Sequence, residues 1–107
     1  MNQKDQKLQE MIRELAAEFF SRESNRTSLI TVTGVEILNR GSKARILLTV
    51  LPENQENAAL DFAHRQLSDF KQHVMEHSRI GHVPFFEVAL DVGEKNRQRI
   101  DEIEKTI

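Results

Sequence analysis

The sequence predicts an α+β domain in which helices cover one face of a three-stranded sheet. Three observations support this: two adjacent segments rich in β-branched residues, a third such segment much later, and amphipathic helical spacing before, between and after them. A chain of 107 residues is long enough for one modest core, so we expect residues 1–107 to fold as a single domain. Residues 92–107 would extend it as a helix that is partly free of the domain.

The N-terminal half predicts a helix followed by a hairpin. Apolar residues recur at helical spacing through residues 5–20, with charges on the other side. Residues 29–38 and 43–51 are rich in β-branched side chains, and the Asn-Arg-Gly-Ser turn between them indicates an antiparallel pair. Alternate residues of the second strand form an apolar face that needs cover, namely Ala44, Ile46, Leu48 and Val50.

A long helix is expected to provide this cover. From Asn57 to about Ser78 the apolar residues step by three and four without a break. A glycine and a proline then end the pattern, and residues 85–91 alternate as a third strand does. One side of that strand would carry Phe86, Val88 and Leu90. Helical spacing returns in residues 94–107, which predicts a last amphipathic helix.

Composition narrows the possible functions. The absence of cysteine excludes a disulfide framework and a thiolate metal site, and it favours a reducing cytosol. The N-terminus lacks the apolar segment of a signal peptide and no apolar run spans a bilayer, so we expect a cytoplasmic protein without a membrane partner. A net charge of −2 argues against a strong nucleic-acid binder, although the acids gather in residues 52–62 and after residue 85, which permits one basic face.

One short motif raises the question of metal catalysis. His73, Glu76 and His77 match the H-x-x-E-H pattern, in which two imidazoles bind zinc and a carboxylate acts as general base. On a helical wheel, however, His77 falls inside the apolar stripe, His73 lies at its edge and Glu76 faces away. The two imidazoles would therefore not meet in an open cleft, as catalytic zinc requires.

Other roles for the histidines stay open as alternatives. A regulatory metal site would use His73, His77 and His82, and protonation near pH ~6.5 would add positive charge to this end of the helix. The sequence has no nucleophile elbow, phosphate loop or dinucleotide fingerprint. We therefore expect no catalytic residue, no metal, no cofactor and no small-molecule substrate.

The element order α-β-β-α-α-β, with the long helix divided in two, is that of the type II KH fold, a small RNA-binding architecture. Particular residues sharpen the likeness over nearly the whole chain: the family's strand patterns VTVT-x-V-E, AKVYVSVL and V-P-E-L-x-F, a D-x-S segment, and a late R-I pair. Their counterparts here are Thr31 to Glu36, Ala44 to Leu51, Val83 to Phe86, Asp91, and Arg99 with Ile100. With no large insertion between these segments, the chain resembles the bacterial ribosome-binding factor A family.

The sequence departs from that family at three places. The basic R-L-R segment that precedes the third strand in the family is reduced here to Arg79, Ile80 and Gly81, with one cation instead of two. Where the family has A-x-G in its long helix, this chain has Gln66, Leu67 and Ser68, so the small residues that allow a bend are largely replaced. The P-E-L step becomes Pro84, Phe85 and Phe86. A straight helix and weaker RNA binding are the alternatives that these replacements favour.

The resemblance implies a monomeric, non-enzymatic assembly factor that binds the precursor of the small ribosomal subunit and its ribosomal RNA, and that supports late maturation, notably in the cold. We expect it to read RNA shape and backbone, because the phenylalanines mostly occupy core positions and leave no aromatic on the exposed helix face for base stacking. The alternative is a KH-like protein-interaction module that has lost RNA binding. The candidate RNA-binding residues are Arg40, Lys43 and Arg45 on the hairpin and Arg65, Lys71 and Arg79 along the helix.

Overall fold

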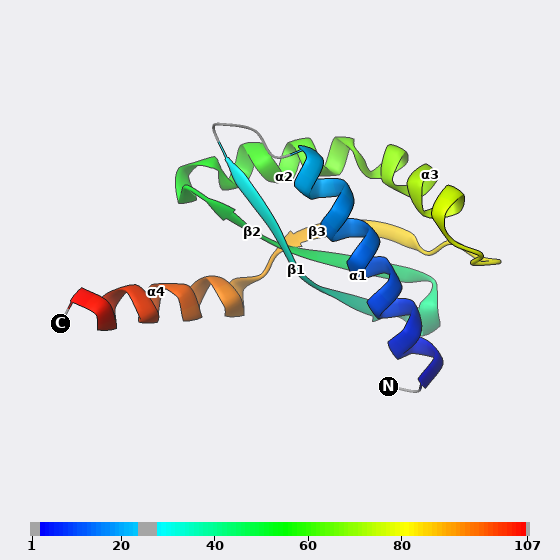
Figure 1. Ribbon diagram of the computed structural model, residues 1–107, viewed down its shortest axis with the longest axis horizontal. Coiled ribbons are helices and arrows are strands. Elements are labelled where there is room, and N and C mark those ends of the chain that lie inside the picture. Colours follow the sequence, from blue (N-terminus) through cyan, green and yellow to red (C-terminus); the bar gives the residue numbers. More distant parts are fainter. Residues whose placement is uncertain (1–2, 24–27, 107) are drawn as a thin grey trace.

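The computed structural model describes residues 3–23 and 28–106, and its elements follow the predicted order (Figure 1). Its strands are β1 (Leu29–Leu38), β2 (Lys43–Leu51) and β3 (Phe85–Leu90). Its helices are α1 (Gln3–Glu23), α2 (Glu56–Arg65), α3 (Leu67–His77) and α4 (Val92–Thr106). Short 3₁₀ turns at Asn39–Gly41 and Glu53–Gln55 complete the chain. The predicted α+β class is confirmed.

The three strands form one mixed sheet in the order β1-β2-β3. β1 and β2 pair antiparallel, as the turn chemistry predicted, whereas β3 runs parallel to β2. The parallel pairing follows from the connection, because α2 and α3 carry the chain from the end of β2 back to the start of β3. At that start the amide of Phe85 donates a hydrogen bond to the carbonyl of Ser42, with 2.9 Å between N and O. The hairpin turn and the beginning of β3 therefore lie side by side.

The core lies on one face of the sheet, between the strands and the helices α1, α2 and α3. The expected apolar face of β2 is buried, and Phe86 of β3 is buried with it. Phe70 of α3 is fully buried at the centre of an aromatic cluster. Its ring centroid lies 4.9 Å from that of Phe86, 5.4 Å from Phe19 and 5.6 Å from Phe20. The Phe70 side chain of α3 thus contacts both α1 and β3.

The long helix divides at Gln66, although its apolar stripe continues without interruption. Gln66 has φ −86° and ψ −1°, and its amide is shared between the carbonyls of Phe62 and Ala63, at 3.1 Å each. Such a local departure from α-helical hydrogen bonding is a usual cause of a bend. Ala63 before the break and Phe70 after it are both fully buried, so each half keeps its apolar side on the core. The sequence left both a straight and a divided helix open, and the structure has the divided form, with α2 and α3 meeting at Gln66.

α4 leads away from the sheet and contacts the body mainly near its own start (Figure 1). Lys95 pairs with Glu53 and Glu56 at 2.9 and 3.0 Å, and Arg99 pairs with Glu53 at 2.5 Å. The apolar side chains of this helix are more than half exposed at Val92, Ile100 and Ile103. Polar contacts therefore hold α4 to the 3₁₀ turn after β2 and to the first residue of α2. None of the helices in the described ranges is long and apolar enough to cross a bilayer.

Asp91 fixes the start of α4. Its Oδ1 accepts the amide of Glu94 at 3.0 Å, as a helix N-cap does, and its Oδ2 accepts the Thr33 hydroxyl at 2.5 Å. The Thr33 hydroxyl and then the Glu94 amide lower the pKa of Asp91, because both hydrogen bonds favour the charged carboxylate.

Asp91→Ala is expected to loosen α4 and cost about 1 kcal/mol of helix stability through loss of the cap. Hydrogen exchange should show faster exchange of the α4 amides, with strand amides unchanged. Asp101→Ala, an exposed acid later in the same helix, is the matched control. Equal protection of α4 in wild type and Asp91→Ala would contradict the capping role.

Candidate nucleic-acid interface

The hairpin turn presents Arg40 at its tip. Asn39, Arg40 and Gly41 have φ values of 51°, 56° and 89°, so three successive residues occupy the left-handed region. The amide and hydroxyl of Ser42 close the turn on the Asn39 carbonyl, at 3.1 and 2.8 Å. Left-handed backbone costs about 1–2 kcal/mol for a residue with a Cβ. The Arg40 side chain in this turn is exposed.

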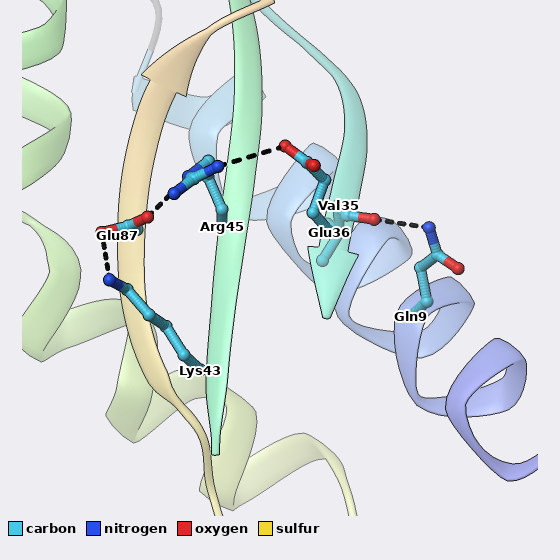
Figure 2. Close-up of polar contacts among 6 residues, drawn as sticks. All are labelled: Gln9, Val35, Glu36, Lys43, Arg45 and Glu87. Atoms are coloured by element: carbon cyan, nitrogen blue, oxygen red, sulfur yellow. Dashed lines mark hydrogen bonds and ion pairs between the residues drawn. The ribbon is translucent and has the colours of Figure 1, made fainter. Parts of the chain in front are cut away.

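The two other hairpin cations take part in an ion-pair network on the open face of the sheet. Figure 2 shows Glu87 of β3 between Lys43 and Arg45 of β2, with Glu36 of β1 on the far side of Arg45. Glu87 lies 2.6 Å from Arg45 and 3.1 Å from Lys43, and Arg45 lies 3.6 Å from Glu36. Hydrogen bonds from Arg45 and then Lys43 lower the pKa of Glu87, and the Glu87 hydrogen bond raises that of Arg45. A phosphate would have to compete with these carboxylates for either cation.

The remaining candidates form no such pairs. Arg65 ends α2, Lys71 lies on α3 and Arg79 follows α3, and all three side chains are exposed. Within the described residues none of them, and not Arg40, has a carboxylate within ion-pair distance, whereas the other arginines each pair with an acid. We call these four residues the unpaired cations: Arg40 lies in the hairpin turn, and Arg65, Lys71 and Arg79 lie on α2, on α3 and just after α3.

A groove lies between the hairpin turn and the start of α3. It has a volume of about 360 Å³, and no aspartate or glutamate is among its lining residues. It brings Lys71 of α3 close to the turn that carries Arg40. The lining residues are Ser42, Leu67, Ser68, Lys71, His82, Val83, Pro84, Phe85 and Phe86.

Phe85 is the residue that the sequence prediction missed. It is 69% exposed at this groove, whereas the neighbouring Phe86 is buried. The prediction considered only the exposed helix face as a place for base stacking, and Phe85 is an exposed aromatic on a strand. Strand alternation contained the signal, because a core-facing Phe86 places Phe85 on the opposite side of β3.

The histidine pair of α3 is arranged opposite to the prediction. His73 is buried, with 8% exposure, and His77 is exposed. The reason is a second packing partner: α1 covers this side of α3, and the Phe19 ring centroid lies 5.5 Å from that of His73. His77 is the last residue of α3, and its ring stacks back on His73 at 4.1 Å while its Nδ1 lies 2.8 Å from the His73 carbonyl oxygen.

The two imidazoles of the H-x-x-E-H motif consequently stack on one another, but Glu76 does not join them. Glu76 is exposed and accepts a hydrogen bond from the side-chain amide of Gln72 at 3.0 Å. The Nε2 atom of His73 is buried and has no hydrogen-bond partner. In the part of the chain that the structure describes, no three potential metal ligands of the His, Cys, Asp and Glu types come together. The geometry therefore gives the motif a packing role on α3.

Burial of His73 makes stability depend on pH. Desolvation by burial, and then the nearby His77, lower the pKa of His73 from its ordinary value of 6.5. In the window between the lowered pKa and 6.5, the unfolded chain binds the proton that the folded chain does not. Acidification through this window therefore favours unfolding.

We expect the free energy of unfolding to fall as pH is lowered from about 7.5 to 5.5, and His73→Phe to flatten this dependence, because phenylalanine does not titrate. Urea denaturation at several pH values measures the effect. Met75→Ala changes an exposed residue of the same helix that does not titrate, and it should keep the wild-type slope. A His73→Phe variant with the full wild-type slope would assign the dependence to other groups.

The fold and this surface together define a small α+β domain with a mixed three-stranded sheet, a two-part helix and four exposed cations that form no ion pair. A domain with this fold is known from the crystal structure of ribosome-binding factor A from Thermus thermophilus, with a TM-score of 0.66 and 20% sequence identity over 78% of this chain and 90% of that chain. A Thermotoga maritima protein, solved by NMR and described as a candidate ribosome-binding factor A, matches with a TM-score of 0.55 and 15% identity over 78% of this chain and 79% of its own. No protein-family model and no curated protein matches the sequence. These likenesses confirm the predicted resemblance at the level of the fold.

Proposed function

We propose that this chain is a non-enzymatic ribosome-assembly factor. It binds the precursor of the small ribosomal subunit and its ribosomal RNA as a cytoplasmic monomer, and it supports late maturation of that RNA, including in the cold. One observation carries the proposal: the chain shares its fold with 90% of a Thermus protein that is named for binding ribosomes.

The charge distribution supports RNA as the partner despite the net charge of −2. The unpaired cations Arg40, Arg65, Lys71 and Arg79 are exposed and hold no carboxylate, so they can receive phosphates without breaking an ion pair. Phosphate contacts of this kind position a protein on RNA and need no bond chemistry. Lys43 and Arg45 join the proposed surface only where a phosphate displaces Glu87.

Sedimentation of the tagged protein through a sucrose gradient of cell extract tests the proposal. We expect it to travel with small subunits or their precursors at low salt and to move toward the free-protein fractions as salt rises, because phosphate contacts release counterions. Recovery only in the free-protein fractions, even in low-salt extract, would refute the proposal.

A second candidate is a KH-like protein-interaction module that has lost RNA binding. It is favoured by the network in which Glu87 and Glu36 neutralise Lys43 and Arg45. Charge reversal of Lys43, Arg45 and Lys71 separates the two: an RNA binder should leave the subunit fractions, whereas an interaction module should keep its cellular partners.

A further inference from the structure

The position of Phe85 calls for an explanation that packing does not give. A phenylalanine that is 69% exposed gains little from the fold, although it lies next to a core residue on a strand whose other side is buried. Phe85 begins β3, and its backbone amide donates a hydrogen bond to the Ser42 carbonyl at 2.9 Å. The backbone that carries the ring is therefore held in place. A preorganised exposed aromatic is the kind of side chain on which a planar ligand stacks.

The surroundings of Phe85 indicate an anionic ligand. Of the groove residues, Lys71 is an exposed cation without an ion pair, His82 is an exposed imidazole, and Ser42 and Ser68 carry hydroxyl groups. No carboxylate lines the groove. On the strand side, Lys43 is the register partner of Phe85 across the parallel pair. The free positive charge beside the ring therefore comes from Lys71 on the helix side, since Lys43 on the sheet side is paired with Glu87 at 3.1 Å.

The groove volume of about 360 Å³ falls in the size class of small-molecule sites, roughly 300–1,000 Å³. We propose that this groove takes an unpaired nucleotide of single-stranded RNA, with its base stacked on Phe85 and its phosphate held by Lys71. The inference rests on the proposed function, and it specifies which form of RNA this surface takes. In an RNA helix the bases are stacked on one another and offer no free face, whereas loops, bulges and ends do.

The chain itself supplies a sensitive probe, because it contains no tryptophan and no tyrosine. Phe85→Trp introduces a single fluorophore at the proposed stacking position. Its emission should be quenched on addition of short oligo-uridine RNA and should change much less with an RNA duplex of the same length. Val92→Trp, at a similarly exposed apolar site on α4 outside the groove, is the matched control and should respond to neither RNA.

Affinity gives a second readout. Phe85→Ala should weaken binding of oligo-uridine about 5- to 100-fold, the range found for removal of one stacked aromatic. Met75→Ala removes another exposed apolar side chain, on α3 and outside the groove, and should stay within about twofold of wild type.

The outcomes separate this inference from the proposed function. Stacking at Phe85 is overturned if the wild-type protein sediments with small subunits while Phe85→Trp is not quenched, or while Phe85→Ala binds oligo-uridine as tightly as wild type. The same holds if wild type binds subunits but no oligo-uridine at all. A wild-type protein that binds neither subunits nor single-stranded RNA refutes the proposed function itself.

Discussion

Simultaneous charge reversal of Arg40, Arg65 and Lys71 to glutamate is expected to weaken binding to the small ribosomal subunit roughly a hundredfold at physiological salt. Each of these exposed cations lacks a carboxylate partner, so each is free to neutralise a phosphate. The slope of log affinity against log salt should become shallower by about one for each lost contact, hence by about three. Gradient sedimentation and filter binding at several salt concentrations measure both quantities.

A control of equal charge separates a defined surface from a general electrostatic effect. Reversal of Arg13, Arg22 and Arg97 changes the net charge by the same amount, but each of these arginines pairs with an acid one turn away on its own helix. This variant should keep most of the affinity. If both triple variants bind equally weakly, net charge alone governs binding, and if both bind like wild type, the unpaired cations play no part.

The sheet and its core could be predicted from sequence because local spacing determines them. β-Branched runs, the Asn-Arg-Gly-Ser turn and alternation along Lys43–Leu51 specify the hairpin and the face of β2 that is buried. Even the contact between Glu36 and Arg45 follows from the hairpin register, in which the two are direct partners. Local sequence predicts contacts of this kind only between strands that follow one another in the chain.

The neutralisation of Lys43 and Arg45 required knowledge of distant pairing. Glu87 reaches both cations only because β3 lies beside β2 in parallel register, with Arg45 opposite Glu87. No local pattern specifies that register, since a long helical connection intervenes. The candidate RNA-binding set therefore mixed paired and unpaired cations, which the structure distinguishes.

The exchange of roles between His73 and His77 has a similar cause. A helical wheel assigns one buried direction, whereas α3 has two packing partners, the sheet and α1. The second partner buries the side on which His73 lies. The division at Gln66 likewise arises from local backbone geometry beneath a continuous apolar stripe, so periodicity alone does not reveal it.

Phe70→Ala is expected to lower the free energy of unfolding by about 3–5 kcal/mol. The side chain is fully buried and contacts aromatic rings from α1 and β3, so its removal leaves a cavity between elements that hold one another in place. Small domains have a total stability of about 5–15 kcal/mol, and the variant should therefore unfold at much lower urea concentration. Far-UV circular dichroism is the appropriate signal in a chain without tryptophan or tyrosine.

Phe85→Ala makes the identical substitution at an exposed position and should change stability by no more than about 0.5 kcal/mol. The comparison determines how binding results are interpreted, because Phe70→Ala would lose RNA through unfolding, whereas Phe85→Ala would lose it as a folded protein. Equal destabilisation by both substitutions would show that Phe85 belongs to the core and would remove its exposed ring as a site for a base. A stable Phe85→Ala protein with weakened oligo-uridine binding would instead assign the loss to the groove itself.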